Sequence, residues 1–328
     1  MTLITGASGF LGQHLVRHLS AQGLQARALY HSHAPADELK KLPGIEWMQC
    51  DLLDIFAVEE AMSGITDVYH CAAIVSFDSR THKQMLHFNP ASTANIVNQA
   101  IEQGIRKMVY VSSVAALGRT GNAKTEISEE TEWENSKYNS AYAVSKYLAE
   151  MEVWRGIGEG LNVAIVNPGI ILGAGTGHDL STQLMKIVNY NFPFYSNGIT
   201  SWVDAADVVK AMSMLMASDI EAERFIISAG NFSYKEVFAH MAAALHKRPP
   251  RFAVNALTAG IGWRLSLLLH KVFGIKTIIT RETAMSATSR SNYDNSKLLG
   301  SLPAFSYTTL QDTIKVMARS FQESYGRK

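Results

Sequence analysis

Short apolar runs alternate with longer helical patterns along most of the chain, and this alternation limits the folds open to it. The strand candidates are 2–5, 25–30, 45–50, 67–72, 107–112, 162–167 and 224–229, and the helix candidates between them are 10–22, 55–63, 91–103 and 140–156. The strand candidates are almost entirely apolar, as strands buried on both faces must be. The pattern predicts an α/β fold, a Rossmann-type doubly wound parallel sheet with helices on both faces.

The rhythm weakens after about residue 168. Turn signals accumulate in "NPGIILGAGTGHD" and "NYNFPFYSNG", and helical patterns at 234–246, 256–273 and 308–322 have few strands between them. We expect a dinucleotide-binding domain over 1–167, to which 200–230 returns, and a smaller, mostly helical C-terminal substrate lobe over 168–199 and 231–328. Gly173, Gly175 and Gly177 are expected to form a crossing loop between the two.

Charge and cysteine content exclude several classes of partner. The net charge of the 328 residues is +1, so no broad field attracts nucleic acid or an anionic membrane. The compact basic cluster Lys247, Arg248 and Arg251 is typical of a solvated loop. Cys50 and Cys71 suit reduced thiols, and no basic region followed by a long apolar stretch opens the chain, so we expect a cytoplasmic protein without a metal site.

The longest apolar region is 256–274, and Arg264 and His270 interrupt it. A charge near the middle of a short apolar stretch argues against an integral membrane segment. We expect a helix packed on the protein or lining an apolar cavity, with peripheral membrane contact as the lesser alternative.

A glycine-rich stretch, "TGASGFLG", joins the first expected strand to the first expected helix. Its Gly6, Gly9 and Gly12 permit a tight turn and a close backbone approach, with a pyrophosphate at the positive end of the helix. The position between strand and helix makes a dinucleotide site the preferred interpretation over a glycine-rich turn without function.

The second expected strand ends "ALYHSHA", without the acidic residue that often bonds the ribose of NAD. His31, with Ser32 and His33, can instead bond a 2′-phosphate, so NADP is preferred and NAD is the alternative. Asp51 in "CDLLD" can accept from the adenine amino group; the alternative is a helix N-cap, a role for which Asp54 is better placed.

Tyr142 and Lys146 stand four residues apart on the expected helix 140–156. They form either a proton-transfer pair or two ordinary residues of a helix surface. The same spacing occurs at Tyr293 and Lys297 in "YDNSKLLG", without a glycine loop or a serine strand before it. We assign that copy no catalysis and expect Asn295 or Ser296 to cap a short helix there.

Together, "TGASGFLG", "CDLLD", "HCAAIV", "YVSSVAALG" and "YAVSK" resemble the extended short-chain dehydrogenases/reductases of the NAD-dependent epimerase/dehydratase superfamily. "VNPGIILGAG" and "YDNSKLLGSLPAFSYTTLQDTIKV" are similar to its dihydroflavonol-reductase and 3β-hydroxysteroid-dehydrogenase branch. The resemblance implies Ser113, Tyr142 and Lys146 as catalytic residues and a possible homodimer through the helices at 91–103 and 140–156. The cofactor contacts that it implies are Gly6, Ser8, Gly9, Phe10, Leu11 and Gly12 at the pyrophosphate, Asp51 and Leu52 at the adenine, Cys71, Ala72, Ala73 and Asn89 toward the nicotinamide ribose, Tyr142 and Lys146 beside it, and Pro168, Ile170 and Ile171 at the nicotinamide.

Two positions depart from the family pattern. Asn167 stands where the family usually has arginine, and Pro90 follows Asn89 where the family continues a helix. Proline fits a helix start or a kink better than a helix interior. Both changes bear on cofactor geometry and leave the reaction class unchanged.

Reduction of a carbonyl needs a hydride donor, a proton donor and a group that holds the oxygen. A free tyrosine has a pKa near ~10, and a lysine ammonium one helical turn away is expected to lower the pKa of Tyr142 toward working pH. Ser113 can donate to the substrate oxygen. Tyr142 is therefore the expected general acid/base.

The sequence also separates the chemistries open to this fold. Val114, Ala115 and Ala116 offer no additional acid beside Ser113, so sugar dehydration is not expected. The second lobe is apolar, so we expect an NAD(P)-dependent oxidoreductase acting on a ketone or secondary alcohol of a fairly apolar small molecule. The alternatives are a nucleotide-sugar epimerase and a catalytically silent dinucleotide-sensing protein. Candidate pocket residues, which are equally suited to the core, are Phe77, Leu117, Tyr195 and Trp202.

Overall fold

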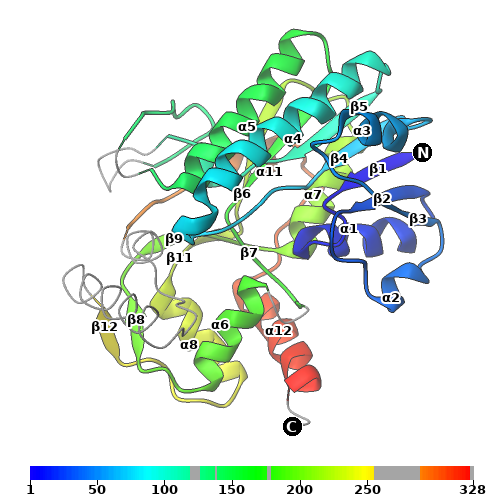
Figure 1. The fold of residues 1–328 in the computed structure, drawn as a ribbon. Helices are drawn as coiled ribbons and strands as arrows, with labels where there is room; N and C mark the ends of the chain where they lie inside the picture. Colours follow the sequence, from blue (N-terminus) through cyan, green and yellow to red (C-terminus); the bar gives the residue numbers. More distant parts are fainter. Residues whose placement is uncertain (119–125, 137–138, 176–178, 255–288, 326–328) are drawn as a thin grey trace.

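The computed structural model describes residues 1–118, 126–136, 139–175, 179–254 and 289–325. Its centre is a seven-stranded sheet with the order β10-β6-β5-β4-β1-β2-β3, and every neighbouring pair in it is parallel (Figure 1). The strands are β1 (Thr2–Thr5), β2 (Ala26–Tyr30), β3 (Ile45–Gln49), β4 (Asp67–His70), β5 (Lys107–Val111), β6 (Val163–Pro168) and β10 (Glu223–Ile227). The predicted doubly wound α/β fold is confirmed, and the strand order reverses between β1 and β4, where ligands bind in such folds.

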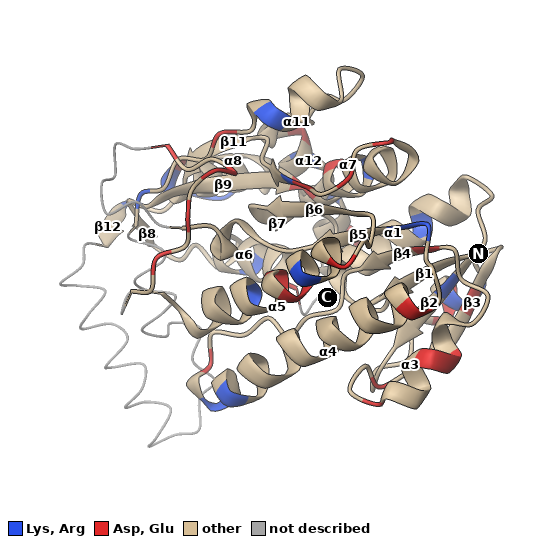
Figure 2. Ribbon diagram, turned by 90° about the horizontal axis from the view of Figure 1, so that it is seen from above, with Lys and Arg blue, Asp and Glu red and all other residues tan. Residues whose placement is uncertain are grey.

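Helices cover both faces of this sheet because successive strand residues point to opposite sides. Ile4 of β1 and Val109 of β5 pack toward α1 and α7, whereas their neighbours Leu3 and Met108 pack toward the opposite core. The first face carries α1 (Phe10–Ala21) and α7 (Ala205–Ala217); the second carries α3 (Ile55–Met62), α4 (His82–Glu102) and α5 (Ala141–Gly158). In Figure 2, α4 and α5 run side by side across that second face, and they pack against each other.

Helix α4 begins well before the predicted start at residue 91, and Pro90 lies inside it rather than at its beginning. Proline removes one backbone hydrogen bond from a helix. The preceding turn is nevertheless helical because Met85 is fully buried and the Asn89 amide is bonded to the backbone of Ile74. Tertiary contacts therefore override the local preference of proline.

A second group of elements packs around Trp202. Its helices are α6 (Leu180–Asn189), α8 (Tyr234–Ala244) and α12 (Leu310–Tyr325). Strands β7 (Ile170–Leu172), β9 (Ile199–Asp204) and β11 (Gly230–Ser233) form a small sheet, and β8 (Phe194–Ser196) pairs with β12 (Phe252–Val254). The sequence did not predict these strands, because they are short and lie within or beside turn signals.

Two further short helices are α2 (Asp37–Lys40) and α11 (Ser296–Ser301). Asn295 precedes α11 as predicted, but the side chain that accepts from the Ser296 N–H is that of Asp294. The helix predicted at 256–273, like Gly177 in the expected crossing loop, lies outside the described residues. Within the described ranges, no helix has both the length and the apolar character that crossing a bilayer requires.

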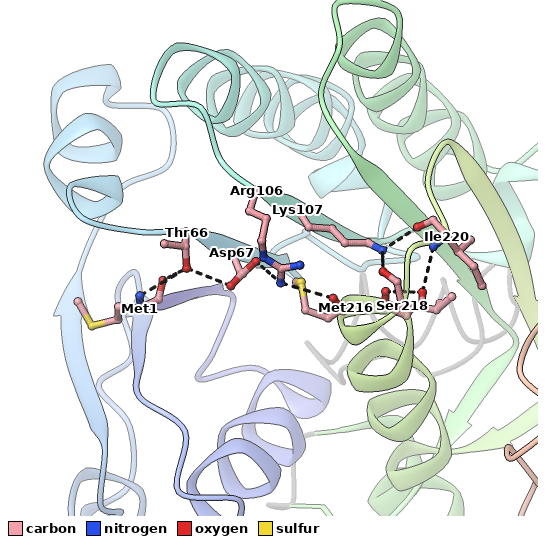
Figure 3. Close-up of polar contacts among 9 residues, drawn as sticks. Met1, Thr66, Asp67, Arg106, Lys107, Met216, Ser218 and Ile220 are labelled. Carbon is pink, nitrogen blue, oxygen red and sulfur yellow. Dashed lines mark hydrogen bonds and ion pairs between the residues drawn. The ribbon is translucent and has the colours of Figure 1, made fainter.

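Polar contacts close the end of the main sheet at which its strands begin (Figure 3). The buried Lys107 Nζ of β5 donates to the carbonyl oxygens of Ser218 at 2.6 Å and Ile220 at 2.7 Å. Arg106 pairs with Asp67 at 2.5 Å beside it. These side chains bind protein atoms, whereas ligands of parallel α/β sheets bind at the opposite, carboxyl-terminal edge.

Candidate active site

The glycine loop between β1 and α1 passes close to other backbone atoms. Gly6 has φ +64°, and a Cβ there would lie 2.8 Å from the backbone N and Cα of Ala72. A Cβ on Gly12 would overlap the carbonyl oxygen of Gly6. This path of the loop therefore requires glycine at both positions.

The amino terminus of α1 carries no side-chain cap from the described residues. Its N-cap is Gly9, and within the described ranges no acidic residue lies in its first turn. In contrast, Asp54 caps α3 and Ser140 caps α5 through side-chain hydrogen bonds. The first N–H groups of α1 are thus available to an anion, as a pyrophosphate site requires.

The residues predicted near the adenine end lie together after β2 and β3. The exposed His31 Nε2 is 3.9 Å from Asp51 Oδ2. Asp51 Oδ1 accepts from the Leu53 N–H at 3.0 Å, and Asp54 provides the cap of α3, as the sequence predicted. Leu52 is buried in the core beneath them.

The segment after β4 crosses directly over Gly6. Thr5 Oγ1 accepts from the N–H groups of Cys71 and Ala72, each at 3.1 Å. Asn89 Oδ1 accepts from the Ile74 N–H at 2.8 Å, and its Nδ2 donates to the Ile74 carbonyl and to Ser145 Oγ. Because both donor hydrogens of Asn89 are engaged, its amide fixes this segment to α5.

Ser113, Tyr142 and Lys146 come together at the carboxyl end of β5. Ser113 Oγ accepts from the Ala115 N–H at 3.1 Å and lies near enough to Tyr142 to oppose the rise that burial causes in the pKa of its phenol. Lys146 is buried on α5, and its Nζ donates to the Val111 carbonyl at 2.8 Å and to the Tyr110 hydroxyl at 3.2 Å. A phenol, a hydroxyl and an amine are therefore assembled at the edge of the sheet where ligands bind.

The protonation of this group differs from the prediction. Burial raises the pKa of Tyr142, and the nearby Ser113 hydroxyl opposes that rise. The expected lowering by Lys146 does not appear, because the amine is bonded to Val111 and Tyr110 on the strand. Burial lowers the pKa of Lys146 to about 8, against the opposing effects of Glu150 and Cys71.

A buried polar chain, which the sequence analysis missed, extends from Lys146 toward the glycine loop. The fully buried His70 bonds Thr5 Oγ1 through Nδ1 at 2.7 Å and Thr93 Oγ1 through Nε2 at 3.1 Å. Its ring stacks on Tyr110, whose hydroxyl is bonded to Thr93. In the sequence, the one sign of His70 was a polar residue inside the largely apolar strand candidate 67–72.

His70 is neutral in this chain. Burial lowers its pKa to about 3, and the nearby Lys146 lowers it further. Thr5 Oγ1 already accepts two N–H groups, so its own proton points to Nδ1 of His70. Nε2 then carries the proton and donates to Thr93, which fixes the tautomer.

A second buried cluster lies below Ser113. Glu150 accepts from Ser112 Oγ at 2.5 Å, from Asn167 Nδ2 at 2.9 Å and from Arg224 Nη1 at 3.1 Å. Asn167 also donates to the Ser113 carbonyl at 3.1 Å. Asn167 stands where the family usually has arginine, and the guanidinium in this cluster comes from Arg224 of β10 instead. Asn167 supports the strand end that bears Ser113.

The four pocket candidates divide into two groups. The Phe77 ring lies 5.9 Å from that of Tyr142, and the half-buried Tyr195 lies beneath the Lys235 ammonium. Leu117 and Trp202 are each 1% exposed, and Trp202 Nε1 donates to the Phe232 carbonyl. The pocket prediction is wrong for these last two, because their surfaces are covered by core neighbours.

The remaining predicted cofactor contacts border these groups. The buried Pro168 ends β6, and the half-buried Ile170 and Ile171 open β7. Four other predicted contacts remain. The Ser8 carbonyl accepts from the Gln13 side chain, and the Phe10 ring packs edge-on against His14. Leu11 belongs to the core, and Ala73 is half-buried. Within the described ranges, no cluster of three or more His, Cys, Asp or Glu residues can hold a metal ion.

Comparisons with known proteins agree with this fold. Residues 2–228 match the model of the NAD dependent epimerase/dehydratase family. A putative dihydroflavonol 4-reductase of Synechocystis sp. is 31% identical over 257 residues, which are 76% of this chain and 74% of the relative. Sterol demethylase protein B of Methylococcus capsulatus is 26% identical over 92% of this chain and 88% of its own. The crystal structure of gox2253 superposes with a TM-score of 0.84 at 26% identity, covering 100% of this chain and 99% of the other.

Proposed function

We propose that this chain, which belongs to the NAD dependent epimerase/dehydratase family, is a reductase or dehydrogenase for a ketone or secondary alcohol of a fairly apolar substrate. The family makes it an oxidoreductase that uses a nicotinamide dinucleotide. The observation that carries the finer proposal is the meeting of Ser113, Tyr142 and Lys146 at the carboxyl edge of the sheet, the edge at which the uncapped α1 also begins. The reductase relative named above supports the same reaction class.

The residues present fit a dinucleotide. Gly6 and Gly12 admit the close backbone path, and the open N–H groups of α1 would hold the pyrophosphate. Asp51 would accept from the adenine amino group. Since β2 ends without an acid, we assign His31 to a 2′-phosphate and prefer NADP over NAD.

When bound, the dinucleotide supplies or accepts the hydride. The phenol of Tyr142 donates its proton to the carbonyl oxygen during reduction and takes it back during oxidation. The hydroxyl of Ser113 donates to the same oxygen and fixes its distance from Tyr142. Lys146, one turn further along α5 and bonded to the end of β5, would hold a positive charge at the same end of the sheet.

The substrate side is assigned from Phe77, which lies against the Tyr142 ring. An aromatic wall beside the proton donor favours an apolar carbonyl compound over a diphosphate sugar. We assign 1–167 with 200–230 to dinucleotide binding and 168–199 with 231–328 to the substrate, and α4 and α5 to a homodimer contact.

Binding and turnover can be measured separately. NADPH fluorescence should report binding, and a panel of aromatic, cyclic and medium-chain ketones should then oxidise the bound NADPH, with Tyr142→Phe as the inactive control. Binding without turnover across the panel contradicts the proposal and favours a dinucleotide sensor. Interconversion of UDP-sugars without net cofactor consumption favours an epimerase instead.

Cofactor preference has its own test, a paired titration with NADPH and NADH. His31→Asp places a carboxylate beside the ribose, so the preference should shift toward NADH. An unchanged ratio of the two dissociation constants would contradict the assignment of His31.

A further inference from the structure

Strands β8 and β12 lie at one end of the molecule (Figure 1). Three exposed phenylalanine rings are in contact there. Phe192, Phe194 and Phe252 are 41%, 43% and 60% exposed. Their ring centroids are 5.5 Å apart between Phe192 and Phe194 and 5.8 Å apart between Phe194 and Phe252. We call these three residues, with the 80% exposed Tyr190 beside them, the aromatic ridge.

Single exposed apolar residues are common, but a contiguous group of aromatic rings indicates a contact surface. The ridge is held in place by the backbone. Phe252 of β12 pairs with Phe194 of β8, and the N–H groups of Arg251 and Phe252 donate to the Pro193 carbonyl. The rings are therefore presented on a fixed edge.

Basic side chains surround the ridge. Lys247, Arg248 and Arg251 are exposed, and the Arg248 N–H bonds the side chain of Asn191 beside the ridge. Residues 179–204 and 233–254, which form α6, β8, β9, α8 and β12 with their caps, contain five basic and three acidic residues, a formal charge of +2, whereas the whole chain carries +1. Figure 2 shows the Lys and Arg colouring near β8 and β12. The solvated basic loop expected from sequence thus adjoins an aromatic surface.

We propose that the aromatic ridge docks on an anionic phospholipid bilayer. The rings enter the interface between headgroups and acyl chains, and Lys247, Arg248 and Arg251 contact the lipid phosphates. Aromatic residues favour this interface because their apolar rings leave water while the surrounding polar groups stay in it. The chain rests on the surface and does not cross the bilayer.

Other occupants fit less well. A second copy facing the first through this end would bring Lys247, Arg248 and Arg251 of both copies together. Stacking of nucleic-acid bases needs open ring faces, but the rings of the ridge meet at 62° and 44° and cover one another in part.

Vesicle co-sedimentation of the full chain tests the proposal. Wild type should bind vesicles of phosphatidylglycerol and phosphatidylcholine, bind phosphatidylcholine alone weakly, and lose binding as salt rises. The triple variant Lys247→Glu, Arg248→Glu and Arg251→Glu should bind about a hundredfold more weakly, since each basic residue near an anionic surface contributes to attraction. Phe252→Ser alone should weaken binding about tenfold.

Phe56→Ser provides the matched control, because Phe56 is 82% exposed on α3 near the acidic Asp54, Glu59 and Glu60. It should bind vesicles like wild type. NADPH binding and the thermal midpoint establish that each variant is folded, and a misfolded triple variant leaves Phe252→Ser and the salt dependence as the test.

Equal binding to neutral and anionic vesicles, or unchanged binding by both ridge variants, overturns the proposal. Two further outcomes overturn it as well: a dimer that the ridge variants dissociate in the absence of lipid, or tighter binding to a single-stranded oligonucleotide than to vesicles. The measurement does not involve turnover, so its result is independent of the reductase assignment.

Discussion

The chain contains two tyrosine–lysine pairs with the same spacing, and the structure treats them differently. Tyr142 and Lys146 both lie on α5, so their side chains stand one helical turn apart on the same face. Tyr293 precedes α11, which begins at Ser296, so the second pair is split between extended chain and a short helix. Identical spacing therefore gives a shared face in only one of the two places.

Their surroundings differ as well. Lys146 is buried and donates to the β5 backbone, whereas Lys297 forms an ion pair with Glu223 at 2.5 Å and lies over the Phe225 ring. Tyr293 packs in a small core cluster, and its backbone bonds the Asn231 amide. A tyrosine and a lysine become a candidate for proton transfer only where a helix faces the carboxyl end of a sheet. At Tyr293 the same residue types serve packing and surface charge.

The largest effect is expected from Tyr142→Phe. Loss of the proton donor should lower turnover of a ketone substrate by about 10²–10⁴-fold, because that is the range of general acid–base contributions. NADPH binding should change little, since the ring remains. Steady-state kinetics and NADPH fluorescence measure the two effects, and Tyr293→Phe should retain turnover. Retained turnover in Tyr142→Phe would remove the functional distinction between the pairs.

Lys146→Met should lower kcat by about 10²-fold, because a fixed positive charge near the reacting group is lost. Lys297→Met should leave kcat unchanged. The two variants keep the length of the side chain and remove one amine each, so they form a matched pair. Similar losses in both would indicate a general electrostatic effect instead of a local one.

Tyr110→Phe should shift the pH dependence of kcat/KM. The wild-type value should fall as pH rises through about 8, where Lys146 loses its proton. Removing the Tyr110 hydroxyl removes an acceptor of the ammonium, so the pKa should fall below about 8 and the alkaline limb should move to lower pH.

Among the groups around Lys146, Glu150, Cys71, His70 and Tyr142 are unaltered by the Tyr110 substitution, so the shift reports the lost hydroxyl. The same profile on Tyr293→Phe serves as the control and should match wild type. An alkaline limb that stays in place in Tyr110→Phe would show that the hydroxyl does not hold the charge of Lys146.

The smallest effect is expected for Lys297→Met, on the free energy of unfolding. Lys297 and Glu223 are partly exposed, with side-chain exposures of 30% and 48%, so loss of their ion pair should lower the free energy of unfolding by about 0–1 kcal/mol. Urea denaturation measures this change. A loss of several kcal/mol would show that the second pair is a structural anchor instead of a surface contact.

The sequence predicted the main sheet well because its strands are apolar on both faces and separated by periodic helices. The family resemblance implied Ser113 and Tyr142 as partners, and the sequence placed Ser113 at a strand end and Tyr142 on the helix 140–156. It could not predict the chain from Lys146 through Tyr110 and Thr93 to His70, because these residues are far apart in sequence and meet only in the folded core. The direction of the Tyr142 pKa depends on that burial, so a pairwise rule gave the wrong sign.

The arginine that neutralises Glu150 has a consequence for how the chain folds. Arg224 belongs to β10, the last strand of the main sheet in sequence order, whereas Glu150 lies fully buried on α5. Loss of the charged partner of a buried ion pair costs about 3–5 kcal/mol, so the chain before β10 is destabilised until Arg224 is in place. The main sheet and the elements inserted before β10 therefore form one cooperative unit. A fragment that ends before residue 223 should not fold as an independent nucleotide-binding domain.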